Sequence, residues 1–144
     1  MSNSDDQQQR DLDNRKAMTR TVAMPADTNP SGDIFGGWVL SQMDIAAGIA
    51  ASQRAHGRVV TASIDAMSFI RPVKVGDILA VYTDITRSGR SSIDIMVEAW
   101  VRRGQIGMRE KVTEAKFTFV AVDDDGKARP LPAEDALPHY GNER

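Results

Sequence analysis

The stretch that decides the fold is Trp38-Val-Leu-Ser-Gln-Met-Asp-Ile-Ala-Ala-Gly-Ile-Ala-Ala-Ser-Gln-Arg-Ala55. It contains no proline, and apolar residues recur at helical spacing over most of its circumference. A helix that is apolar on nearly every side must be covered by other elements. The segment therefore predicts a central helix around which the rest of the chain is wrapped.

The start of this helix is preceded by Gly32-Asp-Ile-Phe-Gly-Gly-Trp38. The glycines at 36 and 37 let a ligand approach the backbone closely, and the first N–H groups of a helix have no partner within it. Amides in that position can hold an oxygen atom that becomes negatively charged. We therefore take Gly36 and Gly37 as candidate catalytic residues.

Asp44 is the one acidic residue in the helical stretch. It lies between Leu40 and Gly48 along the helix, and the small residues Ala47 and Ala51 flank the same face. A carboxylate partly removed from water needs either a partner or a proton, and both conditions suit a general base or a nucleophile. The alternative is a hydrated acid on the exposed strip of the helix.

Composition narrows the possible classes of protein. The 144 residues, of which 41% are hydrophobic, are enough for the core of one domain. A net charge of -2 and a pI near 5.6 disfavour a nucleic-acid surface, and the lack of cysteine excludes disulfides and thiolate metal sites. The chain has no Gly-x-Ser-x-Gly, His-Glu-x-x-His or phosphate-loop motif and no long apolar span. We expect a cytoplasmic protein without stable membrane association, cofactor or metal.

The chain divides into three segments. Residues 1–15 are strongly polar and are predicted to form a disordered tail, residues 16–132 form the folded domain, and residues 133–144 are predicted to be irregular. Within the domain, β-branched and alternating patterns predict strands at 17–23, 58–65, 78–86, 92–101 and 108–122. The resulting plan is α+β, with an antiparallel sheet of about five to six strands wrapped around one long central helix.

Six segments together resemble the YciA-type acyl-CoA thioesterases over about residues 17–132. They are Pro25-Ala-Asp-Thr-Asn29, Gly32-Asp-Ile-Phe-Gly-Gly-Trp38, Ser41-Gln-Met-Asp44, His56-Gly-Arg-Val-Val-Thr61, Phe69-Ile-Arg-Pro-Val73 and Val120-Ala-Val-Asp123. The resemblance implies the hotdog fold and the hydrolysis of acyl-CoA to a free carboxylic acid and coenzyme A. It also implies dimers joined edge to edge and, as trimers of such dimers, a homohexamer.

The same resemblance places the family's catalytic acid at Asp44 and an active-site asparagine of related two-domain thioesterases at Asn29. In those relatives each domain supplies one of the two residues, so a homodimer would form two equivalent sites. Spacing supports a shared site independently, because Gly36 and Asp44 are eight residues apart, about 12 Å along a helix. One helix cannot present both to a single carbonyl, whereas two helices related by a two-fold axis can.

Our hypothesis is that the Gly36 and Gly37 amides polarise the thioester carbonyl while Asp44 of the other subunit acts on the same group. Asp44 can activate a water molecule as general base, or it can attack directly and form a mixed anhydride. The sequence leaves both routes open. In either, Asn29 orients the water or the carbonyl.

Substrate-binding candidates follow from position and from the resemblance. Arginines, Arg87 among them, can bind the phosphates of coenzyme A, although each on its own is also explained as a hydrated surface residue. Two aromatic residues at the helix start can line the acyl channel or make a hydrophobic contact there. The candidates are Phe35, Trp38, Arg58, Val60, Thr61, Arg71, Arg90, Ser91 and Ser92. His56, at the end of the helix, is expected to cap it, and His139 has no assigned role.

Two other functions are compatible with the same fold. One is an acyl-CoA sensor or carrier that binds acyl-CoA without turnover. Asp44 is the feature that distinguishes an enzyme from such a binding protein. The other is a hotdog dehydratase or isomerase, but those enzymes pair a histidine with an acid, and neither histidine lies in the helix or its entry loop. The acyl chain length and the physiological substrate depend on the shape of the channel, which the sequence leaves open.

Overall fold

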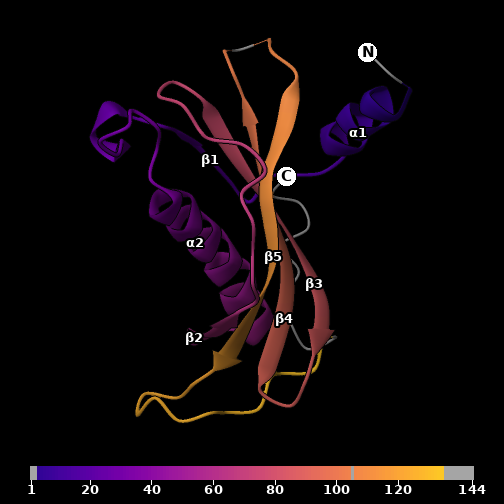
Figure 1. Cartoon of the computed structure of the whole chain (residues 1–144). Coiled ribbons are helices and arrows are strands. Elements are labelled where there is room, and N and C mark those ends of the chain that lie inside the picture. The colour runs from indigo at the N-terminus through magenta and orange to yellow at the C-terminus, as the bar shows by residue number, and fades with distance from the viewer. Residues whose placement is uncertain (1–2, 105, 135–144) are drawn as a thin grey trace.

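The computed structural model describes residues 3–104 and 106–134 and shows a curled antiparallel sheet with a long helix against one face (Figure 1). The described elements are α1 (Asn3–Asp13), β1 (Thr19–Val22), the 3₁₀ helix η1 (Pro25–Asp27), α2 (Gly36–Ala55), β2 (Val59–Ile64), β3 (Ile78–Ser88), β4 (Ser92–Arg102) and β5 (Arg109–Ala121). The predicted α+β plan of a sheet around one long helix is confirmed, with five strands in the sheet.

The strand order in the sheet is β1-β3-β4-β5-β2, and every neighbouring pair is antiparallel. The short strands β1 and β2 therefore lie at the two edges. Register shifts interrupt three of the pairings, between Thr61 and Ser63, between Ile85 and Arg87, and between Ala99 and Trp100. Such irregularities increase twist and bending, which helps the sheet to curl around α2.

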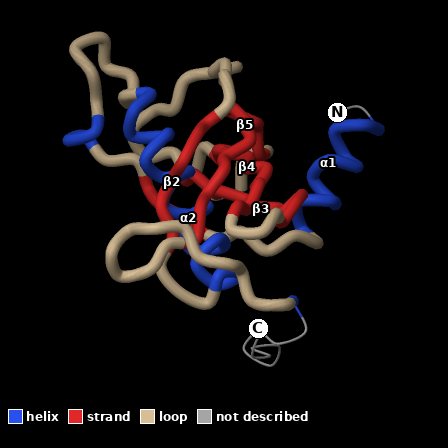
Figure 2. The backbone as a smooth tube through the Cα atoms, turned by 90° about the horizontal axis from the view of Figure 1, so that it is seen from below, coloured by secondary structure: helices blue, strands red, loops and turns tan. Residues whose placement is uncertain are grey.

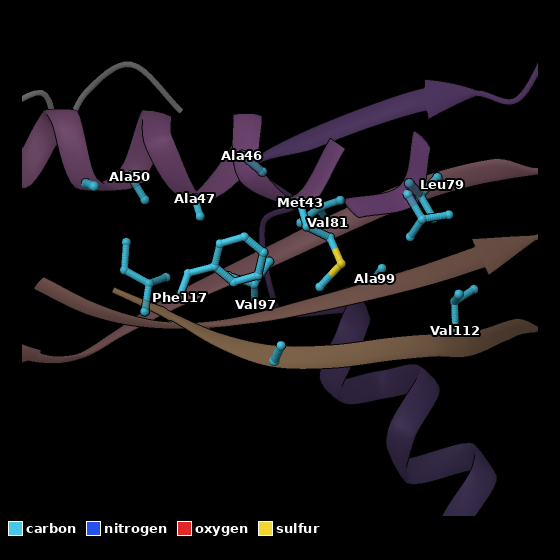
Figure 3. Packing of buried hydrophobic residues seen from close by; sticks show 14 of the residues in the cluster. Met43, Ala46, Ala47, Ala50, Leu79, Val81, Val97, Ala99, Val112 and Phe117 are labelled. Atoms are coloured by element: carbon cyan, nitrogen blue, oxygen red, sulfur yellow. The ribbon is translucent and has the colours of Figure 1, made fainter. Parts of the chain in front are cut away.

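The main core lies between α2 and the inner face of the sheet. Ala46, Ala47 and Ala50 of the helix are buried and face the strands together with Met43 (Figure 3). Small side chains let the helix lie close to the sheet, and larger ones from the strands, such as Phe117, fill the remaining space. The sheet thus covers the buried face of the helix, whereas Ile45 and Ile49 on α2 stay exposed in the single chain.

The end of α2 confirms the capping role predicted for His56. This residue is the C-cap, adopts the left-handed conformation with φ 55°, and donates its backbone N–H to Ser52 O. Arg129 Nη1 donates to Ala55 O at 3.0 Å and so binds a second carbonyl of the last turn. The helix therefore ends at a defined point.

The N-terminal segment corrects one prediction, because residues 3–13, expected within a disordered tail, form the helix α1. It lies on the side of the sheet away from α2 (Figures 1 and 2). Its only buried side chain, Leu12, packs in a small cluster with Ala80, Tyr82 and Trp100. These partners are far from Leu12 in the sequence, so local composition could not indicate that the helix would be held.

Most of the C-terminal segment that is predicted to be irregular lies outside the described residues. Of the segment 133–144, predicted to be irregular, residues 135–144 are outside the described residues. Among the residues that are described, no helix is both long enough and apolar enough to cross a membrane.

Candidate active site

The first turn of α2 offers two free backbone donors. Phe35 is the N-cap, and its carbonyl accepts hydrogen bonds from Trp38 N at 3.1 Å and Val39 N at 3.4 Å. The amides of Gly36 and Gly37 find no acceptor among the described residues. Because the N-terminal end of a helix carries partial positive charge, these two N–H groups are well suited to an oxygen that gains negative charge.

The loop before α2 fixes the side chain of Asn29. Its Oδ1 accepts hydrogen bonds from Ser31 N at 2.9 Å and from Asp33 N at 3.1 Å. Gly32, with φ at 87°, lets the loop turn tightly, and its N–H donates to Asn29 O. Both bonds to Oδ1 come from backbone donors, so the orientation of the amide is determined. Its NH₂ group has no acceptor among the described residues.

A cavity of about 340 Å³ joins this loop to the start of α2. Its walls come from the Asn29–Asp33 loop, from α2 and from the loop that follows β2. The lining residues are Asn29, Asp33, Ile34, Gly36, Val39, Phe69, Ile70, Arg71, Pro72 and Val73. Most of them are apolar, and the polar groups stand at Asn29, Asp33, Arg71 and the helix start. Such a cavity can hold an acyl chain with its carbonyl near polar donors.

Three further contacts hold the walls of this cavity in place. Lys74 Nζ and the carboxylate of Asp33 form an ion pair between the two loops. Arg71 Nη1 donates to Glu110 Oε2 at 2.7 Å, which ties the second loop to β5. Ile34 N donates to Val73 O at 3.0 Å, so the backbones of the loops are also joined directly. The walls are therefore part of the folded framework.

Asp44 is not among the residues that line this cavity. It lies in the middle of α2, partly buried, and its Oδ1 accepts a hydrogen bond of 2.7 Å from Thr61 Oγ1 on β2. Of the alternatives that the sequence leaves open for this carboxylate, the structure thus shows one with a partner. Eight residues of helix separate it from Gly36, about 12 Å along the axis. Within one chain, Asp44 and the Asn29–Gly36 cavity are two separate halves of a site.

The predicted substrate-binding residues fall into two groups. One group is at the beginning of α2. Arg71 lines the cavity there, and Phe35 and Trp38 belong to the N-cap and first turn of the helix. Arg58 lies just beyond the end of α2, where its Nη1 donates to Asp123 O at 3.3 Å. The hairpin with Arg90 and Ser91 is at that same end, and backbone hydrogen bonds join it to Leu131 and Ala121. The structure does not bring the two groups together within one chain.

Val60, Thr61 and Ser92 are related through the sheet. Val60 pairs with Val120, which in turn pairs with Ser92, so these three residues lie in one row across β2, β5 and β4. Side chains alternate between faces along a strand, and Thr61, the next residue on β2, points toward α2 and Asp44. Val60 and Ser92 therefore lie on the opposite face of the sheet from Asp44.

Six apolar residues that line the cavity are not among the site residues predicted from the sequence: Ile34, Val39, Phe69, Ile70, Pro72 and Val73. In the sequence, Val39 and Ile34 look like ordinary core residues because they are apolar. In the structure both are indeed buried. The segment Phe69-Ile-Arg-Pro-Val73 is one of those that carry the family resemblance, yet Arg71 is the one predicted site residue in it. The nearness of this segment to Gly36 is a tertiary contact that no local pattern encodes.

Fold and site together define a hotdog-type thioesterase, and comparison with known proteins agrees. The model of the thioesterase superfamily matches residues 31–107. The chain is 55% identical over 118 residues to the acyl-CoA thioester hydrolase YciA of Salmonella typhimurium, covering 80% of this chain and 89% of that protein. The chain belongs to this family of acyl-CoA thioester hydrolases, as its motifs indicate.

Solved structures agree with the assignment. The hexameric thioesterase of Yersinia pestis superposes with a TM-score of 0.78 at 53% identity, covering 83% of this chain and 98% of that chain. A hexameric broad-specificity acyl-coenzyme A thioesterase superposes with a TM-score of 0.79 at 51% identity, covering 84% of each chain. The predicted hotdog fold is thereby confirmed.

Proposed function

We propose that the protein hydrolyses acyl-CoA thioesters to a free carboxylic acid and coenzyme A, at a site shared between two subunits. The observation that carries the proposal is the division of the site on one chain. Free amides and Asn29 stand at one end of α2, and the carboxylate of Asp44 stands about two turns away. The names of the relatives supply the substrate class, since they are acyl-CoA thioester hydrolases.

A two-fold pairing along β2 would bring the halves together. β2 is an edge strand, and Val60 and Ile64 on it are 40% and 36% exposed. Beside it on α2, Ile45 and Ile49 are 53% and 38% exposed. An open strand edge next to exposed apolar side chains favours association with a second copy. In such a dimer the sheets continue into each other, and each α2 presents Asp44 toward the other helix.

In the proposed reaction, the Gly36 and Gly37 amides of one subunit hold the carbonyl oxygen as it becomes negative. In the general-base route, Asp44 of the partner subunit takes a proton from water, the hydroxide attacks the carbonyl carbon, and the C–S bond breaks to release the thiolate. In the nucleophilic route, the carboxylate itself attacks, the thiolate leaves, and water then hydrolyses the mixed anhydride. Neither route calls for a metal or a cofactor.

Thr61 supports either route in the same way. Its hydroxyl holds Oδ1 of Asp44, so Oδ2 is left to act on water or on the carbonyl. Asn29 has its NH₂ group available because backbone donors occupy its Oδ1. This group can bind the attacking water or the carbonyl oxygen from the side of the cavity.

The hexamer is part of the proposal. The Yersinia pestis protein and the broad-specificity thioesterase are both described as hexameric. We infer that this chain forms a trimer of dimers, with the dimer as the unit that completes the sites. Phosphates of coenzyme A would then meet arginines such as Arg58 and Arg90, and Ser91 and Ser92 would lie beside them.

The decisive experiment measures thiol release from a panel of acyl-CoA esters with the wild type, Asp44→Asn and Asp44→Ala. We expect turnover by the wild type and a loss of about 10²- to 10⁴-fold in both variants. Asp124→Asn, which changes an exposed acid in the turn after β5, is the matched control and should keep full activity. Undiminished turnover by Asp44→Asn would contradict the mechanism. Tight binding without any turnover by the wild type would favour an acyl-CoA sensor.

A further inference from the structure

Phe69 lies against the backbone at the start of α2. A Cβ atom added to Gly36 would be 3.5 Å from Phe69 Cζ and 3.6 Å from Cε2. The ring is therefore in contact range of the helix turn that carries the two free amides, with no side chain between them. Phe69 also lines the 340 Å³ cavity, and 46% of the residue is exposed.

The position of Phe69 is fixed from both sides. Ile70 N donates to Val112 O at 2.7 Å. On the other side, the hydroxyl of Thr113, a fully buried residue of β5, donates to Ser68 O at 2.8 Å. Both neighbours of Phe69 are thus joined to the central part of the sheet. A ring held in this way forms a wall of the cavity.

The rest of the cavity beside the helix start cannot give way easily. Val39 and Val73 are each 2% exposed, and Ile34 is 6% exposed, so all three belong to the packed core. Side chains in a close-packed interior resist displacement, because moving one requires its neighbours to move. The width of the cavity next to the Gly36 amide is therefore set by Phe69 on one side and by the core on the other.

We propose that Phe69 is a specificity-determining residue that selects acyl groups without a branch at the carbon next to the carbonyl. The inference rests on the proposed function, in which the carbonyl oxygen binds at the Gly36 and Gly37 amides. The first carbons of the acyl chain then enter the cavity between the Phe69 ring and Val39. A linear acyl chain fits between these two walls. A methyl branch at the carbon next to the carbonyl would need the space that the Phe69 ring occupies.

Two variants change this width in opposite directions. Phe69→Ala removes the ring and widens the cavity beside the amides. Gly36→Ala keeps the backbone N–H and adds a methyl group at ordinary contact distance from the ring, so it narrows the same place without a clash. Val75→Ala is the matched control, because Val75 lies in the same loop, is 45% exposed and does not line the cavity.

The measurement is the ratio of kcat/KM for butyryl-CoA to kcat/KM for isobutyryl-CoA, two esters with the same number of carbons. One methyl or methylene group in an apolar pocket changes kcat/KM by about 10- to 200-fold. We expect Phe69→Ala to lower the ratio about tenfold or more, Gly36→Ala to raise it, and Val75→Ala to leave it unchanged. Phe69→Leu, a smaller change, should lower the ratio less and serves if the alanine variant does not fold.

The outcomes separate this inference from the function on which it rests. A wild type that hydrolyses neither ester overturns both. A wild type whose turnover depends on Asp44, together with a Phe69→Ala or Phe69→Leu variant that is folded and keeps the wild-type ratio, overturns only the role of Phe69. A wild type that prefers isobutyryl-CoA to butyryl-CoA also overturns it, because the ring would then not be excluding the branch.

Discussion

Two side chains of the proposed site are held in fixed orientations. The carboxylate of Asp44 has its Oδ1 held by the Thr61 hydroxyl, and the side-chain amide of Asn29 is turned by two backbone N–H groups. In both cases one polar atom of the side chain is bound within the fold, and the other is the atom that acts on the substrate in the proposed reaction. Side chains held by their neighbours lose less entropy in the reaction, which is the general basis of preorganised catalysis.

The Thr61 contact leads to a kinetic prediction. Thr61→Val keeps the shape of the side chain and removes the hydrogen bond to Asp44, so kcat should fall by about 10- to 100-fold, the range expected for a bond to a charged group. KM should change much less, because the substrate is not what Thr61 holds in this account. Steady-state kinetics of Thr61→Val and Thr61→Ser test this point. Thr61→Ser restores the hydroxyl and should recover most of kcat, and failure to do so would argue against a positioning role.

At the level of elements, α1 and α2 are held in different ways. α2 is apolar on most sides and packs one face against the sheet, and its own sequence pattern specifies it. α1 is strongly polar and buries only Leu12. Its other anchor is Arg109 of β5, whose guanidinium donates to Gln9 O at 2.8 Å and to Asp13 Oδ1 at 2.6 Å. The guanidinium of Arg109 is buried, whereas the carboxylate of Asp13 is 66% exposed, so water screens this ion pair from one side.

The segment after α1 is tied to the sheet by Arg15. Its Nη1 donates to Glu98 Oε2 at 2.9 Å, and its guanidinium lies 4.8 Å from the centre of the Tyr82 ring. Burial raises the pKa of Glu98, but hydrogen bonds and charge attraction from Arg15, with contributions from Trp100 and Lys111, outweigh it. The net effect is a pKa lowered from 4.5.

This lowered pKa predicts how stability depends on pH. A carboxyl whose pKa is lower in the folded state stabilises the fold fully above its unfolded pKa, here 4.5, and loses that contribution as pH falls through its folded pKa. Glu98→Gln should therefore lower the free energy of unfolding at pH 7, by about 1 kcal/mol for a half-buried pair. Below the folded pKa the difference from the wild type should shrink.

Urea denaturation of both proteins at pH 7 and at pH 3 measures this difference. Glu114→Gln is a control, since it changes a more exposed acid that also pairs with Lys111. A difference between Glu98→Gln and the wild type that stays constant with pH would show that shape, and not charge, is what Glu98 contributes.

For the whole molecule, the important feature is the open edge of the sheet at strand β2. β2 ends the sheet on the side where Asp44 and Thr61 lie, and exposed isoleucines of α2 stand beside it. The same chain carries both halves of the proposed site but cannot join them along one helix. Association with a second copy would cover the apolar surface and complete the site in one step.

Subunit mixing tests the shared site directly. Asn29→Ala and Asp44→Ala are each expected to inactivate the homodimer, because every site then lacks one residue. When the two variants are co-expressed with different tags, each mixed dimer contains one site with both residues intact. Random pairing should then restore about one quarter of wild-type turnover per subunit.

Co-expression of Asp44→Ala with Asp44→Asn is the control and should restore nothing. Two inactive variants that remain inactive when mixed dimers are isolated would place both residues of a site on the same chain. The readout thus depends on the geometry of the assembly and is insensitive to modest changes in stability.

The sequence by itself determined the central helix α2 and the five strands of the sheet. Local patterns specify α2, its N-terminal amides and the strands of the sheet. These patterns are an 18-residue segment with apolar residues at helical spacing, alternating β-branched segments, and glycines at the helix start. Motifs spread over much of the chain also indicated the family of acyl-CoA thioester hydrolases, and the comparisons confirm this family. The His56 cap is likewise local, because the helix ends where its pattern ends.

Only the tertiary structure decided what depends on distant contacts. Residues 3–13 are ordered as α1 because Leu12 and Asp13 meet partners on β3, β4 and β5, which composition cannot anticipate. Phe69 lies at the start of α2 because hydrogen bonds to β5 fix its loop there. The sequence also could not show that Asp44 lies outside the cavity. The cavity forms only when the folded chain brings the Asn29 loop and the Phe69 loop together at the start of α2. Local energies select elements, whereas burial and pairing between remote segments select their neighbours.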